Sequence, residues 1–253
     1  MTLTERHSQI LDILHKQGSV SVLDLANQLD VSSVTIRKDL SFLEQKELLY
    51  RTHGSAILIN PYINDRHVNV KEKLYMEEKR LIGIRAAELI TTNDSIIIAS
   101  GTTIHAFARQ IQTKEHLTVI SAALNVTNIL ARNKNIDIIQ LGGFVRNTSL
   151  STVGNYAEKM LEDFSCSKLY IGVDGIDLDY GLTTTNAMEA TLNRVMMKVS
   201  QKTIVLADSS KFGRRGFSKI CDLNSVDHII TDKNISQKTL DGLHEHGIEV
   251  SIV

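Results

Sequence analysis

The sequence predicts a protein of the α/β class, in which a small helical domain precedes a larger domain built on a doubly wound, largely parallel sheet. Two observations lead to this prediction. In the first 60 residues, apolar side chains recur at the spacing of helices. From residue 77 onward, short continuous runs of Ile, Val and Leu alternate with helical stretches. Such runs are typical of strands buried on both faces, as in parallel sheets that helices cover on both sides.

The first two helices are expected at residues 4–16 and 19–29. Thr4 is placed to cap the first helix, because its hydroxyl can accept a hydrogen bond from a free backbone amide. The inward side of this helix is formed by Ile10, Leu11 and Leu14. The apolar side of the second helix is formed by Val20, Leu23, Leu25, Ala26 and Leu29.

A short turn at residues 30–32 leads into a third helix, for which Ser32 is the expected N-cap. Ile36, Leu40 and Leu43 follow at i, i+4 and i+7, so they form one buried stripe. The opposite side carries small, hydroxylated or cationic residues: Ser33, Val34, Arg37, Lys38 and Ser41. Such a face suits the major groove of DNA, because it offers hydrogen-bond donors and positive charge without bulk.

Residues 48–54, with the sequence LLYRTHG, come next and predict a β-wing. Helix, turn, helix and wing in this order predict a winged helix-turn-helix domain over residues 1–60, with the third helix reading the DNA. The plainer alternative is an amphipathic helical hairpin with a polar outer face. The residues that we expect to contact double-stranded operator DNA are Ser32, Ser33, Thr35, Arg37, Lys38, Ser41, Arg51 and His53.

The charge balance does not by itself indicate a nucleic-acid-binding protein. The formal net charge is −1, and residues 1–60 hold six Lys or Arg residues against seven Asp or Glu residues. Four of these six basic residues fall between positions 37 and 51, on the third helix, just after it and on the wing. We therefore expect DNA binding to depend on local geometry and on dimerisation that doubles the contacts, and not on bulk charge.

The composition also bounds the class of protein. No apolar run is long enough to span a membrane, and the N-terminus has no signal-peptide core, so we expect a cytoplasmic protein with no membrane partner. Cys166 and Cys221 are expected to be reduced, buried thiols. No spacing of Cys and His residues indicates a metal site, and we expect neither a metal nor a cofactor.

Residues 61–76 predict a linker, because Pro61 stops the preceding strand and the residues after it lack a sustained apolar period. The second domain is expected over residues 77–253. Its helices are predicted at residues 79–90, 104–112, 123–132, 155–164, 187–200 and 237–246. Its strands are predicted at residues 95–99, 117–121, 136–141, 168–173, 203–207, 228–231 and 248–253.

Polar residues follow several of these strands, at the edge where the carboxyl ends of parallel strands form a ligand-binding crevice. Twelve of the fourteen glycines lie beyond residue 80, many of them at this edge. The sequence SGTT at residues 100–103 links a strand to a helix. Gly101 allows the backbone to approach a ligand, and the amides and hydroxyls of Thr102 and Thr103 predict a cradle for an anion. A plain strand-to-helix turn would have a similar sequence.

Hydroxyls, carboxylates and cations converge on this edge, which suits a phosphorylated polyol. Lys211 and the SGTT turn are expected to bind the phosphate, while Asp174 and Glu189 bind hydroxyls. The alternative for Glu189 is a solvated pair with Arg194 on the same helix. The residues that we expect to bind the effector are Ser100, Gly101, Thr102, Thr103, Gly143, Arg146, Asp174, Gly175, Thr184, Glu189 and Lys211.

Seven motifs, in this order, resemble the DeoR family of bacterial regulators of sugar metabolism: VSSVTIRKDLSFLE, RTHG, SGTT, GGFVR, GVDGID, GLTTTNAMEA and ADSSKFG. The resemblance extends from end to end of the chain. It implies a winged helix-turn-helix and a sensor domain related to ribose-5-phosphate isomerase and glucosamine-6-phosphate deaminase folds. It also implies repression of a sugar operon, relieved by a phosphorylated sugar. The C-terminal half is most similar to the amino-sugar and hexitol branch.

Two positions depart from the family pattern. Ala99 stands where the family commonly has Asp, which removes one acceptor beside the SGTT turn. Ser55 stands where the family tends to have a second Gly in the wing.

An active sugar-phosphate isomerase or deaminase fused to a DNA-binding domain is the alternative function, with Glu189 or Asp174 as the general base and Lys211 as its cationic partner. No residue is marked in the sequence as a base for the substrate's C2 proton, so we expect no enzyme. A two-fold symmetric operator requires at least a dimer, and we therefore expect a homodimer or a homotetramer.

Overall fold

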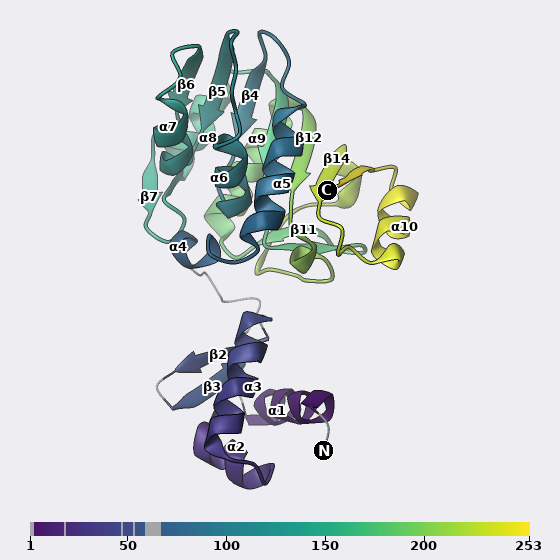
Figure 1. Cartoon of the computed structure of the whole chain (residues 1–253). Helices are drawn as coiled ribbons and strands as arrows, with labels where there is room; N and C mark the ends of the chain where they lie inside the picture. Colours follow the sequence, from purple (N-terminus) through teal and green to yellow (C-terminus); the bar gives the residue numbers. More distant parts are fainter. Residues whose placement is uncertain (1–2, 18, 47, 53, 59–66) are drawn as a thin grey trace. The chain divides into compact units, whose positions relative to one another are not determined.

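The computed structural model describes residues 3–17, 19–46, 48–52, 54–58 and 67–253. The chain divides into two compact units, Met1–Asn60 (unit 1) and Pro61–Val253 (unit 2) (Figure 1). The residues that we expect to bind DNA therefore belong to unit 1, and those that we expect to bind the effector belong to unit 2. None of the helices in the described ranges is both long and apolar enough to cross a membrane.

Unit 1 has the winged helix-turn-helix architecture that the sequence predicts. Its described helices are α1 (Leu3–Gln17), α2 (Val22–Gln28) and α3 (Ser33–Gln45). Its described strands are β1 (Ser19–Ser21), β2 (Leu49–Thr52) and β3 (Ser55–Leu58), which pair antiparallel in the order β1-β3-β2. Strands β2 and β3 form the predicted wing.

The core of unit 1 is built on the predicted apolar stripe of α3. Ile36, Leu40 and Leu43 are at most 2% exposed, and they pack in one cluster with Ile10 and Leu14 of α1. Burying each such side chain stabilises the fold by roughly 1.5–3 kcal/mol. The helical period of the sequence is therefore confirmed for α1 and α3.

The second helix differs from the prediction at its start. Residues 19–21 form β1, because they pair with β3, and α2 begins only at Val22 with Ser21 as its N-cap. Ser21 Oγ accepts a hydrogen bond from the amide of Asp24 at 3.0 Å. The later start places Leu23 on the outer side, where it is 67% exposed and not part of the core. Helix α1 begins at Leu3, so Thr4 is inside the helix and not its cap.

One buried carboxylate, that of Asp39, ties α3 to α1. Arg6 donates from Nε to Oδ2 at 2.6 Å and from Nη2 to Oδ1 at 3.0 Å, and His7 Nε2 lies 3.1 Å from Oδ1. Burial raises the pKa of Asp39, but the hydrogen bonds from Arg6 and His7 outweigh this effect and hold the pKa below its ordinary value. The ionised pair therefore fixes how α3 sits on the rest of unit 1.

Unit 2 is built on a seven-stranded parallel sheet, as predicted. Its strands are β4 (Ser95–Ile98), β5 (Leu117–Ser121), β6 (Ile136–Gln140), β9 (Cys166–Ile171), β12 (Ser200–Leu206), β14 (His228–Thr231) and β15 (Glu249–Ile252). They lie in the order β15-β14-β12-β9-β4-β5-β6, and each neighbouring pair is parallel. The chain adds β5 and β6 on one side of β4, then crosses to add β9 and the later strands on the other side. The strand order therefore reverses between β4 and β9.

Helices cover both faces of this sheet, which gives the predicted doubly wound fold (Figure 1). Helices α5 (Met76–Ala87), α6 (Thr102–Ala108) and α7 (Leu124–Leu130) bury apolar residues against one face. Helices α8 (Asn155–Leu161), α9 (Ala187–Lys198) and α10 (Gln237–Glu245) bury theirs in a second cluster against the other face. The predicted helices and strands of this unit are all present, with ends shifted by at most four residues.

The sequence analysis missed two small antiparallel sheets. One is a hairpin of β7 (Phe144–Arg146) and β8 (Ser151–Val153). The other contains β10 (Gly175–Asp177), β11 (Gly181–Thr184) and β13 (Ser218–Cys221), in that order. Strands of three or four residues are too short to show a period of two in the sequence.

The described part of the predicted linker does not behave as one. Residues 67–76 contain helix α4 (Val68–Lys71) and the start of α5, and they are bonded to the rest of unit 2. The amide of Val68 donates to the carbonyl of Thr148 at 2.7 Å, and Glu72 Oε1 accepts from Arg109 at 2.6 Å. The prediction failed because polar anchors, and not an apolar period, hold this segment in place.

We predict that Asp39→Ala lowers the stability of unit 1 by about 3 kcal/mol, because it leaves Arg6 without the carboxylate that compensates its charge. Hydrogen exchange of the α3 amides in the full-length protein measures this loss. Since the pKa of folded Asp39 is lowered, the contribution is fully present above the ordinary carboxylate pKa. It is lost as the pH falls through the lowered value.

The matched control is Asp12→Ala, which removes an exposed carboxylate from α1. It should change the free energy of opening measured by hydrogen exchange by no more than about 0.5 kcal/mol. Equal protection of α3 in the two variants would show that the Asp39 pair does not hold the helix.

Candidate functional site

The outer side of α3 is open, and it carries the residues that we expected to face DNA. Arg37 and Lys38 are exposed, while Ser33, Thr35 and Ser41 are partly exposed. A shallow depression on this surface is lined by Val34, Arg37, Lys38, Ser41, Phe42, Gln45 and Arg51. The fold thus brings a cation of the wing onto the same surface as the cations of the helix.

Hydrogen bonds fix the first turn of α3 and attach the wing to this helix. Ser32 caps α3 as predicted, since its Oγ accepts from the amide of Thr35 at 3.2 Å. Arg51 donates from its guanidinium to Ser41 Oγ, and its amide donates to Glu44 Oε1 at 3.0 Å. Strand β2 is therefore attached to α3, and the Arg51 guanidinium is oriented along the helix. His53 lies outside the described residues.

A pocket in unit 2 lies at the point where the strand order reverses between β4 and β9. Residues 100–103 follow β4 and residues 172–174 follow β9, and both segments line the pocket. In a doubly wound sheet the carboxyl ends of the two strands diverge at such a point and leave a crevice. The empty space at this point is about 630 Å³ when the open solvent at the mouth of the pocket is included.

The turn after β4 has the backbone geometry that was expected of an anion cradle. Gly101 is the N-cap of α6 and has a φ of +126°, a value that side chains other than hydrogen rarely allow. It presents the start of α6 to the pocket, and the side chains of Thr102 and Thr103 are nearly buried there. Free amides at a helix start attract anions.

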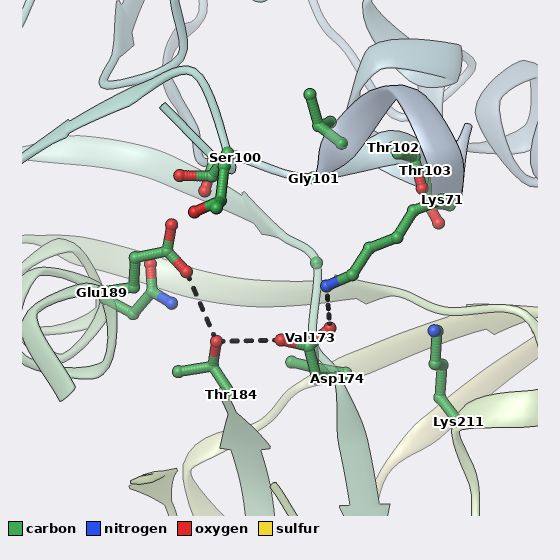
Figure 2. A pocket seen from close by; sticks show the side chains of 15 residues that line it. Lys71, Ser100, Gly101, Thr102, Thr103, Val173, Asp174, Thr184, Glu189 and Lys211 are labelled. Atoms are coloured by element: carbon green, nitrogen blue, oxygen red, sulfur yellow. Dashed lines mark hydrogen bonds and ion pairs between the residues drawn. The ribbon is translucent and has the colours of Figure 1, made fainter. Parts of the chain in front are cut away.

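The carboxylate of Asp174 is held between two lysines. Lys71 Nζ lies 2.8 Å from Asp174 Oδ1, and Lys211 extends from the 3₁₀ turn η1 (Ser209–Lys211) toward the same space (Figure 2). Asp174 Oδ2 accepts from Thr184 Oγ1 at 3.1 Å and from the amide of Thr185 at 3.1 Å. Burial raises the pKa of Asp174, but the charges of Lys71 and Lys211 outweigh it and hold the pKa well below its usual range.

Glu189, which also lines the pocket, forms a second charged pair with Arg146. Arg146 Nη1 lies 2.5 Å from Glu189 Oε1, and both side chains are nearly buried. Thr184 Oγ1 lies 3.5 Å from the other oxygen of Glu189, so it connects Glu189 with Asp174 (Figure 2). The alternative pairing with Arg194 is absent among the described contacts, since Arg194 donates instead to the carbonyl of Lys219 at 2.7 Å.

The structure brings together eight of the eleven residues that the sequence analysis assigned to the effector. The pocket is lined by Ser100, Gly101, Thr102, Thr103, Asp174, Thr184, Glu189 and Lys211. Arg146 is not among the lining residues and supports Glu189 from behind.

Gly143 and Gly175 do not line the pocket, which corrects their assignment. A Cβ at Gly143 would lie 2.7 Å from the carbonyl oxygen of Val153, and one at Gly175 would lie 2.4 Å from that of Arg214. Both glycines are there because neighbouring backbone segments pack closely, not because a ligand approaches.

The lining residues that the sequence analysis missed are Val68, Lys71, Thr148, Ser149, Gly172, Val173 and Asn193. Lys71 was missed because it was placed in the linker, where a charged stretch indicates only a solvated segment. Asn193 follows Glu189 by four residues on α9, a spacing that puts both on one helix face. This spacing is a signal that could have identified Asn193.

We predict that Arg146→Ala lowers the stability of unit 2 by about 3 kcal/mol, because it leaves the nearly buried Glu189 carboxylate without its cation. The double variant Arg146→Met, Glu189→Met should recover most of this loss, since it removes both charges. Urea unfolding of the full-length proteins measures both. A double variant as unstable as the single one would show that packing, and not charge compensation, is what Arg146 provides.

Comparison with known proteins extends over both units. Residues 6–62 match the DeoR-like helix-turn-helix domain, and residues 75–233 match the DeoR C terminal sensor domain. These matches confirm the family resemblance that the seven motifs indicated.

Several relatives match almost the whole chain. A protein of Escherichia coli O157:H7, with the provisional name of aga operon transcriptional repressor, is 38% identical over 252 residues, which are 99% of this chain and 94% of that protein. The HTH-type transcriptional repressor GlcR of Bacillus subtilis (strain 168) is 32% identical over 98% of this chain and 95% of its own. The lactose phosphotransferase system repressor of Staphylococcus epidermidis (strain ATCC 35984) is 32% identical over 94% and 95%.

Among solved structures, ribose 5 phosphate isomerase A from Neisseria gonorrhoeae aligns with 59% of this chain and 57% of its own, at 19% identity and a TM-score of 0.42. A likeness of this size carries no argument about activity. Because both domains match DeoR models and the relatives match almost the full length of the chain, this protein belongs to the DeoR family.

Proposed function

We propose that this protein is a transcriptional repressor of a carbohydrate catabolic operon, and that a phosphorylated sugar bound in the unit 2 pocket releases it from operator DNA. The observation that carries the proposal is that one chain holds an open, cationic reading helix and a polar pocket at a sheet switch point. The names of the relatives, which refer to repression of the aga operon and of a lactose phosphotransferase system, support it.

The DNA-binding half of the proposal rests on the face of α3. Arg37 and Lys38 are exposed and are not part of the hydrophobic core, which is formed by the opposite side of the helix. Arginine and lysine at such positions donate to base edges in the major groove and to phosphates. Arg51, attached to Ser41, adds a contact from the wing. The proposed base-reading residues are therefore those at the centre of α3.

The effector half rests on the charges around the pocket. Lys71, Lys211 and Arg146 carry three positive charges against the two negative charges of Asp174 and Glu189, so the site favours an anion. The lysines and the start of α6 suit a phosphate. Across the pocket, the carboxylate of Glu189 and further hydroxyl and amide groups suit the hydroxyls of a sugar. The further groups are those of Ser149, Thr148 and Asn193.

The pocket is better suited to binding than to the isomerase or deaminase chemistry of the alternative. A general base works best with a pKa near the ambient pH, but the lysines hold the pKa of Asp174 well below its usual range. Glu189 is engaged by Arg146 at 2.5 Å. We therefore infer an effector site without turnover, in line with relatives that are named as regulators.

Release from DNA requires that the effector bind the two states of the repressor with different affinities. The pocket offers such a difference through Lys71, which belongs to α4, the first described element of unit 2 along the chain. An anion that attracts Lys71 competes with Asp174 for it and so changes how α4 is held. We also propose a homodimer or a homotetramer, because a helix-turn-helix protein reads a two-fold operator with paired copies.

We predict that Arg37→Ala weakens operator binding by about 5- to 150-fold, because one bidentate base contact is worth about 1–3 kcal/mol. The operator is a fragment selected by the wild-type protein from a random-sequence pool, and fluorescence anisotropy gives the affinity. The control variant, Lys16→Ala, removes an exposed cation from α1 and should bind as the wild type does. Near-wild-type affinity of Arg37→Ala would contradict the assignment of α3.

We predict that at least one sugar phosphate raises the melting temperature of the full-length protein, and that Lys211→Ala abolishes this rise. At one hundred times its Kd a ligand stabilises the folded state by about 2.7 kcal/mol. The panel contains ketose, aldose, amino-sugar and hexitol phosphates. Lys198→Ala, at an exposed position of α9, is the control and should respond like the wild type. The assignment fails if no compound stabilises the wild type, or if Lys211→Ala responds equally.

A further inference from the structure

Asn193 carries a buried amide that the described fold does not use. It lies on α9 and is 8% exposed, whereas the other buried residues of this helix are apolar and pack in the core: Ala190, Leu192 and Met196. Its side chain makes no hydrogen bond within the described part of the chain. Asparagine favours a helix less than alanine or leucine does, and a buried amide without a hydrogen bond costs stability. The folding of unit 2 therefore does not explain this residue.

The amide of Asn193 opens onto the pocket of unit 2. Asn193 is one of the lining residues, and its side-chain atoms are not among the fully enclosed polar atoms that lack a partner in the described ranges. Buried polar side chains almost always have a hydrogen-bond partner, and an amide offers two donors and one acceptor. The partner of this amide must therefore come from the pocket, as solvent or as a ligand.

The charges around the pocket decide which part of a ligand meets Asn193. Glu189 precedes Asn193 by one helical turn, so the two side chains are neighbours on one face of α9. Figure 2 shows Glu189 and Lys211 on opposite sides of the pocket, with Asp174 between them. A phosphate is attracted by the lysine and repelled by the carboxylate of Glu189. The uncharged part of a phosphate ester is therefore the part that reaches Asn193.

Glu189 and Asn193 offer this uncharged part different hydrogen-bonding groups. Oε1 of Glu189 already accepts from Arg146 Nη1 at 2.5 Å and from Ser151 Oγ at 3.3 Å, and a carboxylate in such a pair only accepts. The amide of Asn193 can both donate and accept. A sugar hydroxyl has one donor and two acceptor sites, so it can donate to the carboxylate and accept from the amide at the same time. The two side chains together therefore suit a polyhydroxylated group.

We propose that Asn193 is the specificity-determining residue of this pocket. Its amide binds a hydroxyl of the ligand at the end remote from the phosphate, and so selects polyhydroxylated phosphate esters against inorganic phosphate. This inference rests on the proposed function, because it takes the ligand to be a phosphorylated sugar. A ligand that lacks the hydroxyl covers the amide without pairing it, and a site built to pair a hydroxyl discriminates strongly against such a ligand.

The test measures the sugar end and the phosphate end of the pocket separately, by isothermal titration calorimetry of the full-length protein. The probes are fructose 6-phosphate, glucose 6-phosphate, glucosamine 6-phosphate and sorbitol 6-phosphate, and inorganic phosphate is titrated as a competitor of the tightest of them. We expect Asn193→Leu to bind this sugar phosphate about 5- to 150-fold more weakly, because a hydroxyl is left unpaired. The competition constant of inorganic phosphate should stay within about twofold of the wild-type value, since Lys71 and Lys211 are unchanged.

Asn193→Ala is a second variant, in case leucine does not fit the pocket, and it should give the same pattern. The matched control is Asn128→Leu, because Asn128 is an exposed residue within α7 and does not line the pocket. This control should bind both probes as the wild type does. Because the amide of Asn193 has no described partner in the ligand-free protein, both Asn193 variants should keep or raise the melting temperature measured without ligand.

The inference is overturned if the sugar phosphate binds both Asn193 variants as tightly as the wild type, which would make solvent the ordinary partner of the amide. It is also overturned if the variants weaken sugar phosphate and inorganic phosphate equally, or if both lower the ligand-free melting temperature. In these cases a sugar phosphate still binds the wild type, so the proposed function stands. If none of the four sugar phosphates binds the wild type, the proposed function fails and this inference fails with it.

Discussion

The reversal of strand order between β4 and β9 is the constraint on which the rest of unit 2 depends. Two neighbouring strands whose chains continue in opposite directions leave a crevice at their carboxyl ends. The first segment beside the crevice presents the start of α6, and the second presents Asp174. Lys71 and Lys211, which are far from each other in the sequence, meet at that carboxylate from α4 and η1. The strand order therefore creates the crevice, and the particular side chains then determine its chemistry.

The cations beside Asp174 and Glu189 determine the chemistry of the pocket. Each carboxylate beside the crevice has a cation close by, and the two lysines hold the pKa of Asp174 well below its usual range, so Asp174 stays ionised and is not poised to take a proton. A surplus of one positive charge remains for a ligand. The same pairs connect the pocket with α4 and with the β7–β8 hairpin.

Much of this could be read from the sequence. The stripe of Ile36, Leu40 and Leu43 predicted the core of unit 1, and the continuous apolar runs predicted the parallel sheet. What could not be predicted depends on contacts distant in sequence. Lys71 lies in a charged stretch with no apolar period, and only its distance to Asp174 reveals it. Gly143 appeared to be a ligand residue because it follows a strand, whereas the backbone of β8 is what requires a glycine there.

In the function that we propose, the pocket of unit 2 controls the DNA affinity of unit 1. The most direct test is the Kd of the full-length wild-type protein for its selected operator, with and without a saturating concentration of the sugar phosphate that stabilises it. We expect the effector to raise this Kd at least tenfold, which is a coupling free energy of about 1.4 kcal/mol or more. An unchanged Kd at saturation would contradict it.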